Sequence, residues 1–168
     1  MLEEEIIFKQ TLLKTQFKGD TNIIDLHIKH ILEFDEGRVK SNIGGYQSND
    51  ITFGFQELIT FVFECFKEYN SNVILDNFWL NINKGTHFNK AHIHASNTWS
   101  VVYYHRVCCE KAALYFETLT PTLNNEPKQF FPKNQEIYFF DGLLPHGTVP
   151  CEQESHERIS IAFNFVKK

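Results

Sequence analysis

Apolar residues recur at two different spacings along this chain. In residues 21–36 and 54–69 they return every three or four positions, which is the period of a helix that buries one face. Asp20 or Thr21 can cap the first of these segments, because a short polar side chain there can accept a hydrogen bond from the first turn. From residue 72 onward the period is two, as expected for strands that bury one face. The pattern therefore predicts two N-terminal helices followed by a β-rich region.

Short strands separated by Gly, Pro and Asn residues are expected throughout the second region. They lie at residues 72–83, near 92, and at 99–107, 112–117, 129–131, 136–140, 147–150 and 157–165. Because no helical segment separates them, they are typical of an antiparallel sandwich or barrel. We predict an all-β core with flanking helices: a double-stranded β-helix, or cupin-like jelly roll, with two N-terminal helices. Residues 6–17 are ambiguous, and Ile6, Ile7 and Phe8 form a candidate edge strand.

The length of 168 residues fits one domain. We expect a single domain over residues 1–168, with helical support in 1–71 and the jelly-roll core in 72–166. The apolar helix at 54–69, or an edge strand, is available for a homodimer.

Charge narrows the range of partners. The formal net charge is −5, and binding to phosphate backbones is driven by Lys and Arg, so a nucleic-acid partner is disfavoured. No apolar run reaches the ~18–20 residues that span a bilayer. The acidic start of the chain lacks the basic residues of a secretory signal. We expect no membrane partner and a cytoplasmic location, where the four cysteines would stay thiols.

Three histidines are the strongest candidates for chemistry. His92 and His94 are two positions apart in an extended segment, so both side chains point to one face and can reach one cation. His146 follows an apolar strand and a turn that contains Gly and Pro, and a jelly roll can bring it beside the first two. For His92 and His94 alone, the alternative is a pair of surface histidines.

The last strand supplies a candidate anion site. Apolar and polar residues alternate there, so Arg158 and Ser160 share one face. If the apolar residues face the flanking layer, Arg158 faces the barrel interior, where a charged side chain needs an anion. Arg binds a carboxylate through two hydrogen bonds, and a serine hydroxyl can add another. The alternative is a structural Arg that pairs with a neighbouring acidic residue.

The order of these motifs resembles that of the Fe(II)- and 2-oxoglutarate-dependent oxygenases. It is most similar to a small branch that has His-x-His in place of His-x-(Asp/Glu). The resemblance spans roughly residues 40–166, and 41–48 looks like the Gly-Gly-aromatic-Gln-Ser stretch of that branch. The matching motifs are His92-Ile93-His94, Tyr103-Tyr104, Leu144-Pro145-His146 and the run from Arg158 to Asn164.

This resemblance implies Fe(II) as the metal, 2-oxoglutarate as the cosubstrate, and hydroxylation of an unidentified substrate with release of succinate and CO₂. The implied metal ligands are His92, His94 and His146. Arg158 would hold the far carboxylate of 2-oxoglutarate, helped by Ser160 and Tyr104. The candidates for polar side chains around these groups are Asp141, Asn97 and Asn164.

The third ligand departs from the common pattern of two histidines and one carboxylate. His94 stands in the carboxylate place, which leaves the site one negative charge short, and zinc also accepts three histidines. Two alternatives follow: a cupin-like three-His metalloprotein that does not use 2-oxoglutarate, or a non-catalytic jelly-roll interaction protein. In each case the loops at 41–50 and 118–130 are the expected places for contacts with a substrate.

Overall fold

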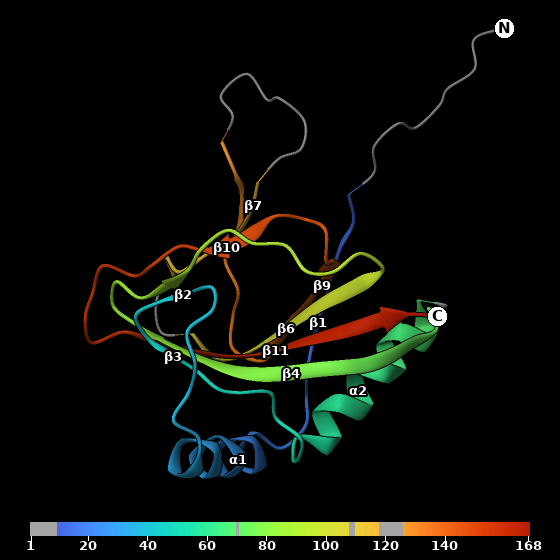
Figure 1. Ribbon diagram of the computed structural model, residues 1–168, viewed down its shortest axis with the longest axis horizontal. Coiled ribbons are helices and arrows are strands. Elements are labelled where there is room, and N and C mark those ends of the chain that lie inside the picture. The colour runs from blue at the N-terminus through green and yellow to red at the C-terminus, as the bar shows by residue number, and fades with distance from the viewer. Residues whose placement is uncertain (1–9, 70, 108–109, 118–125) are drawn as a thin grey trace, which may run out of the picture.

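Two helices, a large sheet and two small sheets form three successive layers in the computed structural model, which describes residues 10–69, 71–107, 110–117 and 126–168 (Figure 1). The helices are α1 (Thr21–Phe34) and α2 (Gln56–Glu68). The strands are β1 (Leu12–Gln16), β2 (Asn42–Ile43), β3 (Tyr46–Gln47), β4 (Val73–Lys84), β5 (Phe88–Asn89), β6 (Thr98–Val107), β7 (Leu114–Phe116), β8 (Lys128–Phe130), β9 (Glu136–Asp141), β10 (His146–Thr148) and β11 (Glu157–Lys167).

Every strand pair in the described residues is antiparallel. The large sheet has the order β1-β9-β6-β11-β4-β3, and the small sheets have the orders β10-β7-β8 and β2-β5. Both helices lie on one side of the large sheet, and β2, β7 and β10 lie on the other side (Figure 1). This arrangement confirms the predicted double-stranded β-helix with two N-terminal helices.

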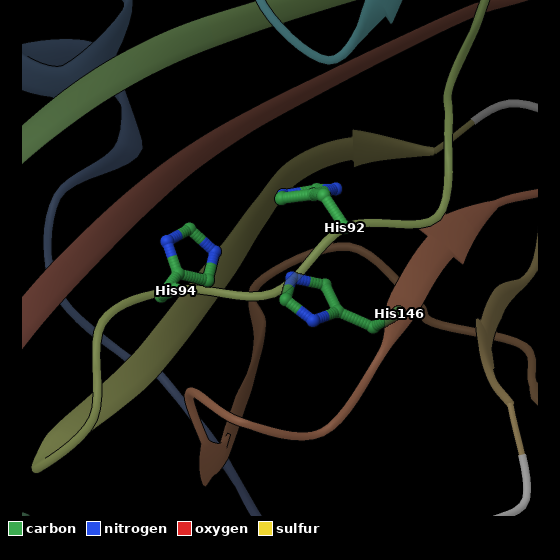
Figure 2. A group of neighbouring side chains, drawn as sticks. All are labelled: His92, His94 and His146. Carbon is green, nitrogen blue, oxygen red and sulfur yellow. The ribbon is translucent and has the colours of Figure 1, made fainter.

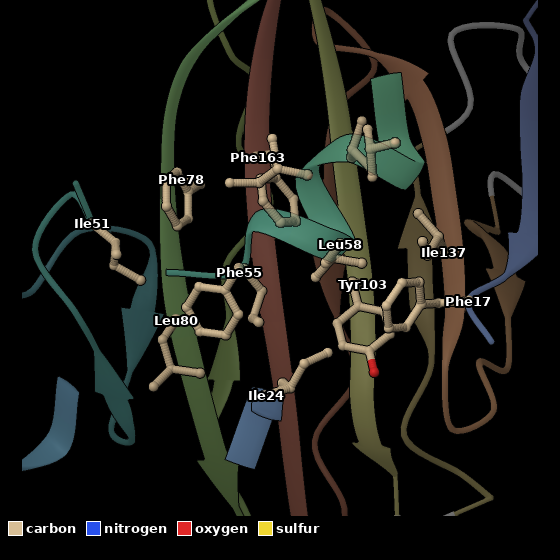
Figure 3. Packing of buried hydrophobic residues seen from close by; sticks show 14 of the residues in the cluster. Phe17, Ile24, Ile51, Phe55, Leu58, Phe78, Leu80, Tyr103, Ile137 and Phe163 are labelled. Atoms are coloured by element: carbon tan, nitrogen blue, oxygen red, sulfur yellow. The ribbon is translucent and has the colours of Figure 1, made fainter. Parts of the chain in front are cut away.

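The main hydrophobic core lies between the helices and the large sheet. Helix α1 begins after Asp20, whose Oδ1 accepts a hydrogen bond from the backbone of Asn22 at 2.8 Å, as an N-cap should. Aromatic and branched side chains of the helices interlock with those of the sheet (Figure 3). The face of β11 that joins this core is formed by Ile159, Ile161, Phe163 and Phe165.

The first 71 residues contribute more strand than the sequence pattern predicted. Strand β1 pairs with β9 at one edge of the large sheet, and β3 pairs with β4 at the other edge. Both had been assigned to ambiguous or loop segments, because strands this short carry too few residues for a visible alternation. The candidate edge strand at residues 6–8 lies outside the described residues, and the division into 1–71 and 72–166 stays a prediction.

The cysteines differ from the expectation. Cys65 is a free thiol, but Cys151 is disulfide-bonded, so the expectation that all four are thiols is wrong for Cys151. Among the described residues, no helix is long and apolar enough to cross a bilayer.

Candidate metal and cosubstrate site

The three predicted histidines meet on the side of the large sheet that faces away from the helices (Figure 2). Backbone hydrogen bonds place them: His92 and His146 exchange two N–H···O bonds of 3.0 Å, and the His94 N–H donates to the Gly142 carbonyl at 2.7 Å. One nitrogen from each ring lies within 4.8 Å of those of the other two. His92 was predicted on a strand, but it forms only an isolated bridge with His146.

Glycine at position 142 allows this close approach. A Cβ atom there would lie 3.2 Å from the His94 Cβ and 3.0 Å from the Thr98 carbonyl oxygen, which is tighter than ordinary contacts. The turn before His146 therefore needs a residue without a side chain in order to reach the segment that carries His94.

Backbone carbonyls orient two of the rings. The His92 Nδ1 lies 2.8 Å from the Lys90 carbonyl, and the His146 Nδ1 lies 2.7 Å from the Leu144 carbonyl. A carbonyl oxygen can only accept, so each Nδ1 must carry the proton. The Nε2 lone pair of each ring is then free, which is the tautomer that a metal-binding histidine adopts.

His94 and His146 are held in the neutral form. Burial, together with the nearby His92, lowers the pKa of His94 to about 4 and that of His146 to about 3. A protonated imidazole cannot bind a metal, so a low pKa favours ligation at neutral pH. Three neutral imidazoles suit a borderline divalent cation such as Fe(II) or Zn²⁺. The donor set therefore fits the predicted metal.

A narrow cavity of about 40 Å³ lies beside the histidines. Its lining includes His146, Tyr104, Ser160 and Asn164. Ser160 faces Tyr104 across the β11–β6 pair, immediately after a β-bulge. The sheet thus brings together three of the predicted polar residues.

Arg158 lies one step further along the same face of β11. It is only 5% exposed and lines a separate small cavity together with Asn83, not the histidine cavity itself. Its Nη1 donates to the Val149 carbonyl at 3.4 Å, whereas its Nη2 has no hydrogen-bond partner. Within the described residues Arg158 forms no ion pair, so the alternative of a structural Arg paired with an acidic neighbour is not supported.

The charge of Arg158 acts on the hydroxyl of Tyr104. Burial raises the pKa of Tyr104 to about 12, against the opposing effect of the Arg158 charge. Burial in turn lowers the pKa of Arg158. The Tyr104 hydroxyl also lacks a partner, so an unpaired hydroxyl and an unpaired guanidinium N–H lie near each other in a desolvated region. Such a pair of donors suits a carboxylate.

Two residues predicted around the site form their hydrogen bonds elsewhere, and their place around the metal stays a prediction. The Asp141 Oδ2 accepts from the Lys167 Nζ at 2.6 Å, and its Oδ1 accepts from the Leu143 backbone. Asn97 stands in a turn with a φ of 65° and donates to the Lys167 carbonyl at 2.8 Å. Both residues fix the end of β11, and neither bonds to the histidines. The prediction had relied on their closeness in sequence to His94 and His146.

Strand β4 contributes site residues that were not singled out from the sequence. Trp79 and Asn81 line the histidine cavity, and the Oδ1 atoms of Asn81 and Asn83 are buried without partners. The alternation of Asn77, Trp79, Asn81 and Asn83 against apolar residues was visible in the sequence. It could have identified this face as a polar lining, because β4 pairs directly with β11.

A double-stranded β-helix with three clustered histidines, and with a buried arginine that forms no ion pair with the described residues, has the groups that a metal ion and an acid would need. Residues 77–164 match the family described as "Putative 2OG-Fe(II) oxygenase", which covers more than half of the chain. The chain belongs to this family, and it is an Fe(II)- and 2-oxoglutarate-dependent oxygenase, as the motifs predicted.

Solved structures share the fold at low sequence identity. The viral collagen prolyl hydroxylase of Paramecium bursaria Chlorella virus-1, in complex with 2-oxoglutarate, is 13% identical (TM-score 0.64; 92% of this chain and 96% of that chain). The Pseudomonas putida prolyl-4-hydroxylase is 12% identical (TM-score 0.64; 95% and 94%). HygX of Streptomyces hygroscopicus, with nickel, 2-oxoglutarate and hygromycin B, is 10% identical (TM-score 0.69; 94% and 83%). No curated protein sequence matches the chain.

Proposed function

We propose that His92, His94 and His146 hold the Fe(II) ion, and that Arg158, Tyr104 and Ser160 hold the far carboxylate of 2-oxoglutarate. The reaction is R–H + O₂ + 2-oxoglutarate → R–OH + succinate + CO₂. One oxygen atom enters the new hydroxyl group and the other enters succinate. Of the four electrons that reduce O₂, two come from the oxidative decarboxylation of the 2-oxo acid and two from the C–H bond of the substrate. Held by the three histidines, the metal would supply the activation of O₂ that hydroxylation of a C–H bond requires.

The metal assignment is supported by the free Nε2 atoms of His92 and His146. The carbonyls of Lys90 and Leu144 fix both rings, so these side chains need not reorganise to bind an ion. The low pKa values of His94 and His146 mean that protons do not compete strongly for the site at neutral pH.

One observation carries the cosubstrate assignment: Arg158 is buried, forms no ion pair with the described residues, and leaves its Nη2 without a hydrogen-bond partner. A desolvated charge without a counter-ion is costly, so a site that keeps one is expected to receive an anion. The Tyr104 hydroxyl lacks a partner too, and Ser160 stands opposite Tyr104 in the sheet. The cavity is narrow, and we therefore expect side chains to rotate when a five-carbon acid enters.

The proposal is tested by measuring succinate formation from 2-oxoglutarate and O₂ in iron-loaded protein. Wild type should form succinate, and Arg158→Met should need at least about tenfold more 2-oxoglutarate for the same rate, since one charge-assisted pair of bonds is lost. The matched control is His30→Ala, a histidine that packs between Phe34 and Phe53 on the surface, and it should behave as wild type. An unchanged 2-oxoglutarate requirement in Arg158→Met would remove Arg158 from the site.

A cytoplasmic location and a homodimer are further proposals. The acidic composition supports the first, but a disulfide at Cys151 is more common in oxidising compartments. Cell fractionation with thiol alkylation before lysis distinguishes the two environments, and light scattering gives the mass in solution.

A further inference from the structure

A second cavity, of about 370 Å³, opens on the other side of His92 and His94. It shares Trp79 and Asn164 with the narrow cavity, so the two spaces adjoin at the histidines. A volume of this size suits a small-molecule ligand. Any molecule bound there lies next to the proposed metal, on the side away from Arg158.

The outer part of this cavity is basic, although the whole chain is acidic. Arg38, Lys40 and Lys90 line it, against a single acidic residue, Asp50. The Asp50 carboxylate is already bonded to the Arg38 Nη2 at 2.5 Å. Lys40 and Lys90 form no ion pair with the described residues, so two positive charges remain uncompensated.

The chain brings the two lysines together through its backbone. The Lys90 N–H donates to the Ser41 carbonyl at 2.8 Å, next to the place where β2 pairs with β5. Lys40 and Lys90 therefore come from neighbouring segments that are far apart in sequence.

Unpaired polar atoms line the deeper part. The Arg38 Nε, the Gln47 Oε1 and the Asn164 Oδ1 are buried and have no hydrogen-bond partner. The Arg38 guanidinium lies 5.9 Å from the Trp79 ring centroid, which holds it in place. An unpaired N–H and two ammonium groups that form no ion pair with the described residues, all lining one cavity, suit an anion. The two amides suit hydroxyl or amide groups.

We propose that the primary substrate is a small polar molecule with an anionic group, either a carboxylate or a phosphate. Lys40 and Lys90 bind the anion at the mouth, and Arg38 adds a third positive charge to the same cavity. Gln47 and Asn164 bind polar groups nearer the histidines, where the reacting carbon lies. The inference rests on the proposed function, because it makes this cavity the substrate side of the same metal.

The test is a titration followed by the NMR signal of the Trp79 indole N–H. The protein is loaded with Zn²⁺, which cannot support turnover, and is saturated with 2-oxoglutarate so that the Arg158 site is filled. The Trp99→Phe background assigns the remaining indole signal to Trp79. The probes are inorganic phosphate and N-acetylglycine, with N-acetylglycinamide as the neutral counterpart.

Phosphate or N-acetylglycine should shift the Trp79 signal saturably, and the comparison of the two shows which anion fits better. The double variant Lys40→Gln/Lys90→Gln should weaken that binding by about tenfold. The matched control Lys18→Gln/Lys29→Gln removes the same charge from residues that do not line the cavity, and it should change affinity less than twofold.

Three results would overturn the inference. The first is no saturable shift of the Trp79 signal with either anion, and the second is an affinity for N-acetylglycinamide equal to that for N-acetylglycine. The third is an equal loss of anion affinity in the Lys18→Gln/Lys29→Gln control. Failure of the proposed function is seen separately. If 2-oxoglutarate itself causes no change in the NMR spectrum of the Zn²⁺-loaded protein, the cosubstrate assignment fails. The anion titration can still be followed at the Trp79 indole signal in that case.

Discussion

The two faces of β11 differ in whether their buried groups have packing or hydrogen-bond partners. On the helix side, Ile161 and Phe165 are fully buried among other apolar side chains. On the opposite side, Arg158 and Ser160 are almost as buried, but the arginine keeps an unpaired N–H. One strand therefore carries a complete core on one face and an incomplete polar site on the other.

This difference separates stability from function along a single strand. A buried donor or acceptor without a partner costs about 1–3 kcal/mol, so the polar face destabilises the empty protein. The aromatic core on the helix side offsets that cost. Substitutions on the two faces should consequently act on different measurements.

Phe165→Ala should have the largest effect on stability. Phe165 contacts the rings of Phe63 and Phe66 at centroid distances of 5.2 and 5.0 Å, and its removal leaves a cavity. We expect the free energy of unfolding to fall by about 3–5 kcal/mol in denaturant titrations. Val166→Ala, the next residue on the same strand and 38% exposed, should cost less than about 1 kcal/mol. A similar loss of unfolding free energy in both variants would contradict the view that the helix-side face of β11 carries the stability.

Acid should destabilise the metal-free protein through the histidines. The unfolded pKa of histidine is about 6.5, whereas the folded values are about 4 for His94 and about 3 for His146. Between these limits the unfolded state binds more protons, so stability rises with pH and is lost as pH falls from 6.5 toward 4. At about 1.4 kcal/mol per pKa unit for each histidine, the two groups together give an expected loss of roughly 5 kcal/mol.

The measurement is the free energy of unfolding at several pH values in the presence of a chelator. His94→Gln/His146→Gln serves as the comparison, because glutamine does not titrate. Between pH 6.5 and 4, the free energy of unfolding of this variant should change clearly less with pH than that of wild type. An equal change would show that other groups cause the acid sensitivity.

Arg158→Met should change ligand binding without harming the fold. Methionine fills much of the same volume and removes an unpaired buried charge, so stability should stay equal or rise. The affinity for 2-oxoglutarate should fall roughly 10- to 100-fold in calorimetric titrations, while metal affinity stays within about threefold. Strong destabilisation with unaltered 2-oxoglutarate affinity would place Arg158 in the structural core instead.

His94→Asp should have the smallest effect. A carboxylate at this position restores the negative charge of the common ligand set, so Fe(II) binding should strengthen several-fold in a competition assay with a chelator. Weaker binding would mean that the site is tuned for three imidazoles.

The sequence predicted those parts of the fold in which the periodicity runs over many residues. Helices α1 and α2 and the long strands β4, β6 and β11 were expected near their observed positions. The two-residue strands β2 and β3 were not, because their pairing depends on partners distant in sequence. They matter for the candidate site, since Gln47 lies in β3 and Ser41 directly precedes β2.

The candidate site shows the same limit. His92, His94 and His146 were predicted because their spacing and turn chemistry are local signals, and the sheet does bring them together. Asp141 and Asn97 were assigned by closeness in sequence, but Lys167 engages both from the far end of β11. Asn81, in contrast, lines the cavity but was not predicted. Its position follows from its pairing with Ser160 and not from any local motif.

The most direct test of the account is an anaerobic titration of the metal-free protein with Fe(II), with and without 2-oxoglutarate, followed by visible absorption. The account predicts one iron per chain, a spectral change that requires 2-oxoglutarate, and loss of both in His146→Ala. Absence of stoichiometric iron, or full iron affinity in both His92→Ala and His146→Ala, would contradict the metal assignment. Iron binding without any response to 2-oxoglutarate would instead indicate a three-His metalloprotein that uses no 2-oxo acid.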